Sequence, residues 1–262
     1  MSTASWSDVN DIVPSWFGHF ILTNFNVPLP GFDRDRDGQP VRTAEWLEHR
    51  LDLFERFCLP SVMGQTCQRF TWLVRYDDAA PGAHGRLDRY AGYGNLRIVP
   101  AELRFRTFIP SMLPRGTQYV VTTRLDNDDA LHCQAIADIQ AAIKPQEAEF
   151  LNFPFGYTYS VPDNRFGLNE RHSNAFISLV ERVTDRRLRT ARCINHNRAA
   201  EVARVRQLDT QPRWVQVIHE RNLDNSLQGT ETTLQGVERA FNIGPYGREL
   251  VAALLAARTA AE

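Results

Sequence analysis

Short apolar runs that end in polar turn residues recur along the chain, and each predicts a buried strand. The clearest runs are residues 17–25, 70–76, 96–99, 119–125, 150–159 and 214–219. Apolar residues at helical spacing predict helices at residues 43–59, 83–90, 131–143, 174–181 and 234–257. The first of these has Thr43 as its N-cap and Pro60 just past its end. Strands alternating with helices predict an α/β fold with a mainly parallel sheet flanked by helices.

Polar side chains gather where three of the predicted strands end. These side chains are Thr23, Asn24 and Asn26, then Asp77 and Asp78, and finally Asp126, Asp128 and Asp129. In a parallel sheet, ligands bind at the carboxyl ends of the strands. The pattern therefore predicts one binding site at that edge of the sheet.

The run Asp126-Asn127-Asp128-Asp129 is the most distinctive of these clusters. Its carboxylates repel one another, so folding them together is costly unless a cation or hydrogen-bond donors compensate. Carboxylate oxygens suit Mn²⁺ or Mg²⁺, which keep waters and bridge to substrate phosphates. A second interpretation is purely structural, with Asp129 capping a helix that begins at Leu131.

Composition narrows the possible functions. The chain has 262 residues, 43% of them hydrophobic, and a net charge of -1, so no overall field draws it to nucleic acid. Lys144 is the only lysine and precedes Pro145, which argues against a lysine-based phosphate loop or Schiff base. The cysteines lack zinc or redox spacing, no signal peptide is recognisable, and the apolar stretch at 251–257 is too short to span a membrane. We therefore expect a cytoplasmic protein without a transmembrane segment.

Residues 182–206 contain eight arginines, and three interpretations of this segment are open. It forms a solvated face, or it holds a diphosphate through bidentate guanidinium contacts, or it receives an anionic glycan or lipid phosphate in peripheral contact with a membrane. Nucleic acid is not favoured, because aromatic residues do not interleave with the arginines at a nucleic-acid motif.

Several motifs in order resemble a known family. The segments are residues 21–26 (ILTNFN), 60–66 (PSVMGQT), 70–78 (FTWLVRYDD) and 123–131 (TRLDNDDAL). Together they resemble the inverting glycosyltransferases of family 2. A more specific resemblance, extending to about Gly229, is to the putative rhamnosyltransferase family. The resemblance implies a single GT-A domain over residues 1–262, with a donor half at 17–130, an acceptor half at 131–230 and a helical tail at 231–262.

The resemblance also implies a role for each residue at the strand ends. The side chains expected to line the donor nucleotide are Thr23, Asn24 and Asn26, with Asp77 and Asp78 at the base or ribose. Asp126 is expected at the ribose or a metal-bound water, and Asp128 as a direct ligand of Mn²⁺ or Mg²⁺. His219, which follows the last predicted strand, resembles the late histidine that reaches the metal or the diphosphate in many GT-A enzymes.

An inverting transfer also needs a base that takes the proton of the acceptor hydroxyl. Enzymes of family 2 place an acidic residue or pair downstream of the donor site, and residues 174–214 hold no such pair. The candidates are His196, which precedes a predicted helix, and Glu170, with Asp163 as a third. This departure from the family pattern leaves the base and the inverting outcome open.

These patterns predict a metal-dependent glycosyltransferase that moves a sugar from a nucleoside-diphosphate sugar to a hydroxyl of a glycan or related acceptor. Rhamnose is implied by the family name alone. Two alternatives remain: a GT-A module that binds a nucleotide sugar without turnover, and a sugar nucleotidyltransferase. The second ranks lower, because the loop after the first predicted strand has neither a lysine nor a glycine run.

Overall fold

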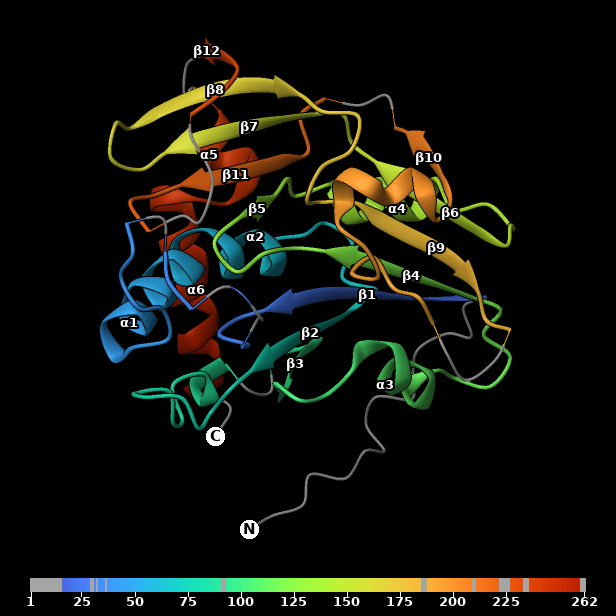
Figure 1. Cartoon of the computed structure of the whole chain (residues 1–262), viewed down its shortest axis with the longest axis horizontal. Coiled ribbons are helices and arrows are strands. Elements are labelled where there is room, and N and C mark those ends of the chain that lie inside the picture. The colour runs from blue at the N-terminus through green and yellow to red at the C-terminus, as the bar shows by residue number, and fades with distance from the viewer. Residues whose placement is uncertain are drawn as a thin grey trace.

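The computed structural model describes most of the chain. The described residues are 16–28, 31, 33–35, 37–90, 93–184, 188–208, 211–221, 227–232 and 236–259. Figure 1 shows a large central sheet with a second sheet beside it, drawn at the top of the view, and the C-terminal helix α6 next to α1 and α2.

The central sheet is seven-stranded and mainly parallel, as the sequence predicts. Its order is β10-β6-β9-β4-β1-β2-β3. Strand β1 lies between β2 and β4 and is parallel to both, and β3 continues the parallel set. Strand β9 is antiparallel to its two neighbours. The strands are β1 (Phe17–Asn24), β2 (Thr71–Tyr76), β3 (Leu96–Pro100), β4 (Tyr119–Arg124), β6 (Ala148–Asn152), β9 (Ser178–Arg182) and β10 (Arg204–Gln207).

A second, five-stranded sheet has the order β12-β8-β7-β11-β5 and was not predicted. Its strands are β5 (Ala130–Leu131), β7 (Phe155–Ser160), β8 (Arg165–Glu170), β11 (Trp214–Ile218) and β12 (Thr230–Thr232). The single strand predicted at residues 150–159 is in fact β6 and β7, one in each sheet. Pro154 lies between them and has no N–H to donate to a ladder, so pairing stops there.

The first helix begins as predicted but runs further. In α1 (Ala44–Leu53) the Thr43 hydroxyl accepts a hydrogen bond from the Trp46 N–H at 3.2 Å. The helix continues through a π-helical segment, Phe54–Cys58, into α2 (Leu59–Met63), so the predicted end before Pro60 is wrong. Pro60 is tolerated because it lies in the first turn of α2, directly after the π segment.

Two predicted helices are absent. Residues 83–90 form turns and a 3-10 helix, Asp88–Tyr90, because Gly82 and Gly85 adopt φ of 72° and 68°. Residues 174–181 lead into β9, since Asn174 accepts from the Phe176 N–H at 3.0 Å and forms a turn.

Two other helices differ from their predictions. The helix predicted at 131–143 is the shorter α4 (Ala135–Ala141), because residues 130–131 pair with β11. Helix α3 (Phe105–Met112) was not predicted.

The predicted C-terminal helices are present as α5 (Val237–Phe241) and α6 (Gly244–Thr259). Val251 and Leu255 of α6 pack against the core that includes Trp72 and Leu59. This helix therefore belongs to the domain. Over the described residues, no helix is both long and apolar enough to cross a membrane.

Candidate active site

The polar strand ends meet at one edge of the central sheet. Asn26, just after β1, donates to the Asp77 carbonyl at 2.8 Å, and its own side-chain oxygen accepts from the Asp77 N–H at 2.7 Å. Asn127, after β4, donates to the Phe25 carbonyl at 2.9 Å. The parallel order of β2, β1 and β4 thus brings together the clusters that lie apart in the sequence.

Asp126 is held between two guanidinium groups. Its Oδ2 lies 2.8 Å from Arg124 Nη2, and its Oδ1 lies 2.8 Å from Arg192 Nη2. Arg192 also donates to the carbonyls of Leu22 and Leu125, at 3.1 Å each. Burial alone would raise the pKa of Asp126, but the two arginines outweigh it and hold the pKa well below its usual range. Arg192 therefore ties the ends of β1 and β4 to this carboxylate.

Asp128 forms a compact triangle with a guanidinium and an imidazole. Its Oδ2 lies 2.9 Å from Arg50 Nη1 and 3.1 Å from His219 Nε2, and these two nitrogens are 3.0 Å apart. Burial opposes ionisation of Asp128, yet Arg50 and His219 lower its pKa overall. The carboxylate is therefore ionised at neutral pH.

Asp129 has a structural role that differs from the predicted cap. Its Oδ1 accepts from the Val217 N–H at 2.9 Å and so links the strand end to β11. The capping interpretation for a helix at Leu131 is wrong, because the helix begins at Ala135. Burial and the neighbouring charges of Asp128 and Asp126 raise the pKa of Asp129 well above its usual range.

The donor atoms of Asp128 and His219 fit a divalent cation. Two ligands at right angles on an ion with bonds of about 2.1 Å lie about 3.0 Å apart. The 3.1 Å between Asp128 Oδ2 and His219 Nε2 matches that spacing. Arg50 contacts both atoms and would have to move aside. Asp126 fits less well, because each of its oxygens already accepts from an arginine.

A cavity of about 640 Å³ opens beside Asp77 and Asp78, beyond the ends of β2 and β3. Tyr76, Ile98 and Pro100 contribute apolar surface to it. Asp78 accepts from the Gly85 N–H at 2.9 Å and lies 2.7 Å from the His84 ring nitrogen. An apolar wall with carboxylates at its rim suits a heterocyclic base and a sugar hydroxyl.

Asp77 is positioned by an arginine that sequence reasoning missed. Arg42 pairs with the Asp77 carboxylate, and its Nε donates to the Asn26 carbonyl at 3.1 Å. Arg42 has a φ of 63°, a left-handed conformation that is uncommon for arginine.

Thr23 and Asn24, at the end of β1, have different surroundings. The Thr23 hydroxyl is fully buried and accepts from the Trp72 indole N–H at 3.0 Å, so it supports the strand end from within the core. Asn24 has a buried side-chain oxygen without a hydrogen-bond partner. Such an acceptor is unusual in a folded protein and is open to a ligand donor.

Of the candidate bases, His196 is the one with a described contact to an arginine that pairs with Asp126. It begins a 3-10 helix, His196–Glu201, and its Nδ1 lies 3.4 Å from Arg124 Nη1. Burial, followed by the charge of Arg124, lowers the pKa of His196 to about 4. Glu170 is exposed and lies 3.5 Å from His172. Asp163 accepts from the Ser160 hydroxyl at 2.6 Å.

Four of the six described arginines in the arginine-rich segment pair with glutamates outside the site. Arg182 pairs with Glu147, and Arg206 with Glu149. Among the described arginines of this segment, only Arg192 forms an ion pair with the Asp126–Asp129 run. Arg50, which pairs with Asp128, comes from α1, and the helical spacing of the apolar residues there does not single it out.

We compared the chain with curated proteins, with solved structures and with the sequence profiles of protein families. None of the curated proteins matches this chain. Solved structures of Staphylococcus aureus TarS residues 1–349, alone and with UDP-GlcNAc, have TM-scores of 0.43 and 0.44, identities of 12% and 13%, and cover 76% and 79% of this chain. The chain spans 60% of the length of those structures. The inositol-1-phosphate CTP transferase of T. maritima has a TM-score of 0.33 and 10% identity over 92% of this chain and 97% of its own.

The sequence profile of a family described as "Putative rhamnosyl transferase" matches residues 36–230, which is most of the chain. That range contains the Asp77–Asp78 and Asp126–Asp129 clusters and His219. The chain therefore belongs to this family, whose description is that of glycosyltransferases.

Proposed function

We propose that this chain transfers a sugar from a nucleoside-diphosphate sugar to a hydroxyl group of a glycan or related acceptor. One observation carries the proposal: the cavity beside Asp77 and Asp78 opens at the same sheet edge as the charged cluster of Asp126 and Asp128. A nucleoside would occupy the cavity, and its diphosphate would extend toward that cluster.

In this arrangement the cavity selects the nucleoside. The carboxylates of Asp77 and Asp78 would accept hydrogen bonds from a base N–H or a ribose hydroxyl. Asn26 and Arg42 hold Asp77 in place through its backbone and its side chain. The unpartnered oxygen of Asn24 offers one more acceptor at the end of β1.

The positive charge that balances the donor diphosphate would come from Arg50 and a divalent cation. Asp128 and His219 would hold Mn²⁺ or Mg²⁺, which neutralises the leaving diphosphate when bound. Displaced from Asp128, the Arg50 guanidinium would bind phosphate oxygens, for which its planar fork is suited. Arg124 and Arg192 keep Asp126 ionised and fixed between the two strand ends.

The proposed base is His196, and the proposed outcome is inversion. Its lowered pKa of about 4 means that the imidazole is neutral at pH 7 and can accept a proton. The same pKa makes it a weak base, which favours a second candidate function, nucleotide-sugar binding without turnover. A bound diphosphate would counter Arg124 and raise this pKa.

Release of nucleoside diphosphate from a panel of nucleoside-diphosphate sugars, with the hydroxyl of water accepting the sugar in place of the glycan, separates the two candidates. We expect metal-dependent release by the wild type, a loss of about 10²-fold or more in His196→Gln, and unchanged release in a Glu170→Gln control. Donor binding without release in the wild type, at any pH between 6 and 9, would establish the binding module instead.

A further inference from the structure

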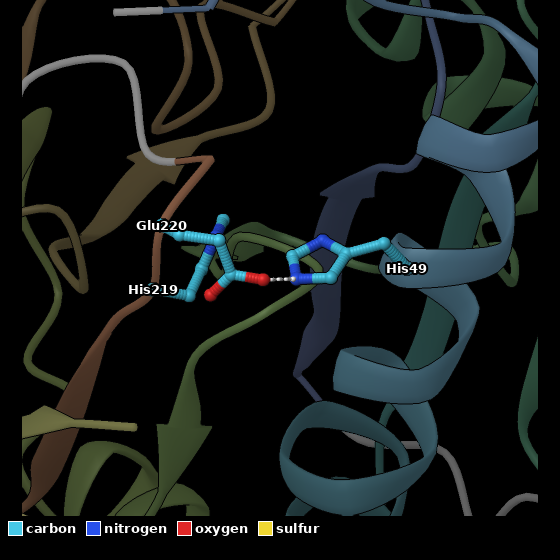
Figure 2. Close-up of side chains that lie close together, drawn as sticks. All are labelled: His49, His219 and Glu220. Carbon is cyan, nitrogen blue, oxygen red and sulfur yellow. Dashed lines mark ion pairs between the residues drawn. The ribbon is translucent and has the colours of Figure 1, made fainter. Parts of the chain in front are cut away.

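Three ligand-type side chains converge beside Asp128 and come from two elements. His49 lies on α1, and His219 and Glu220 directly follow β11. One ligand atom from each residue lies within 4.8 Å of the other two. Figure 2 shows the His49 ring facing Glu220 across the space between the helix and the strand, with His219 beside the carboxylate.

The contacts within this cluster are short and leave one ligand atom unused. His49 Nε2 lies 2.9 Å from Glu220 Oε1, and the two imidazole rings are 5.0 Å apart between centroids. The second ring nitrogen of His49, Nδ1, is buried and has no hydrogen-bond partner. Neighbouring ligand atoms on a tetrahedral ion with bonds of about 2.1 Å are about 3.4 Å apart, so small side-chain rotations, with Arg50 moved aside from His219 Nε2, would complete the site.

The chemistry of this cluster differs from that of the aspartate run. Two imidazoles and one carboxylate suit a first-row transition metal, whereas Mg²⁺ prefers oxygen ligands alone. Asp128, 3.1 Å from His219, lies next to the cluster, and its charge is balanced by Arg50. Glu220 therefore brings an additional negative charge to the cation position, while the oxygens of Asp126 accept from arginines.

We propose that His49 and Glu220 join His219 in a transition-metal site, so that the cation that the proposed function places between His219 and Asp128 is held from the α1 side and not by Asp126. The role of this ion at the donor diphosphate rests on the proposed function. Binding of the ion does not rest on that function, because the chain itself supplies all three proposed ligands. The proposal also gives a selectivity: Co²⁺ and Zn²⁺ bind more tightly than Mg²⁺.

The test uses the full chain without nucleotide and Co²⁺ as the probe. Calorimetry and the visible absorption of bound Co²⁺ should give one ion per chain for the wild type. His49→Gln and Glu220→Gln should each weaken that binding by at least about tenfold. His84→Gln is the matched control, because His84 also pairs with a carboxylate, at 2.7 Å from Asp78, but has no second imidazole beside it. Glu220 is 58% exposed, so its variant is expected to fold even if the His49 variant does not.

Each outcome decides the question. Weaker Co²⁺ binding in both cluster variants with an unchanged control supports the site. Equal binding in the wild type and both variants, with loss in Asp128→Asn, would place the ion on the aspartate run and overturn the proposal. No Co²⁺ binding would also overturn it. In that case metal-independent binding of a nucleoside diphosphate, measured separately, would leave the proposed function standing.

Discussion

The ion pair between Asp126 and Arg192 should be a strongly coupled element of this fold. Breaking a buried pair by removing one partner costs about 3–5 kcal/mol, and we take about 3 kcal/mol for Asp126→Asn because this carboxylate is 30% exposed. Arg192→Met loses the same pair and also removes a donor from the Leu22 and Leu125 carbonyls, at roughly 1 kcal/mol each. We therefore expect about 5 kcal/mol for the arginine variant.

The double variant should cost only about 1 kcal/mol more than Arg192→Met alone, because the second change then removes only the remaining pair with Arg124. The coupling free energy is then about 2 kcal/mol. Urea unfolding measures each value, and the melting temperature of Asp126→Asn should fall by roughly 6–12 °C. Glu201→Gln, which breaks an exposed pair with Arg198, is the control and should cost less than about 1 kcal/mol. Additive losses, or an Asp126→Asn loss no larger than that of the control, would refute the reasoning.

Three further changes have defined outcomes. Burial lowers the pKa of His19 to about 3, so its folded form resists protonation and stability should fall as pH drops from 6.5, by about 3 kcal/mol at pH 4. Denaturant unfolding at each pH should show a shallower fall in His19→Gln. In Gly156→Ala the added Cβ would lie 1.9 Å from the Trp214 ring, so unfolding should become easier by at least about 1–3 kcal/mol, and an unchanged denaturation midpoint would contradict this. Arg50→Ala should weaken nucleoside diphosphate binding by roughly 10–100-fold in calorimetry with metal present, through loss of a charged hydrogen bond, while equal affinity would exclude Arg50 from the diphosphate site.

The parallel half of the central sheet was predictable from sequence because its strands are buried on both faces. Residues such as Ile21, Leu22 and Trp72 are fully buried, so an unbroken apolar run marks each strand. Apolar runs also marked β11 and part of β7, but strand β9 and the pairing of the second sheet were not predictable in this way. Ala130 and Leu131 become a strand only because β11 lies beside them, and local periodicity does not contain that partner.

The candidate site was likewise predictable only in part: residues at strand ends could be recognised locally, whereas their partners from distant parts of the chain could not. The carboxylates at the ends of β2 and β4 could be predicted, since strand order brings the carboxyl ends of parallel strands together. The arginines that hold them could not, because their partners are far away in sequence: Arg50 is 78 residues from Asp128, and Arg192 is 66 residues from Asp126. The arginine-rich segment at residues 182–206 indicates that arginines could reach the site, but it does not identify Arg192 as the one that does. An isolated histidine such as His49 gives no signal until the fold places Glu220 beside it.

The central claim is that the cavity next to Asp77 and Asp78 binds the nucleoside of a nucleoside-diphosphate sugar. Calorimetric titration of UDP, dTDP, GDP and ADP, each with Mn²⁺ and with chelator, tests it most directly. The structure predicts that one nucleotide binds and that Asp78→Asn weakens it by roughly tenfold, the loss of one hydrogen bond at the cavity rim. Failure of every nucleotide to bind, with or without metal, or equal affinity in the wild type and Asp78→Asn, would contradict it.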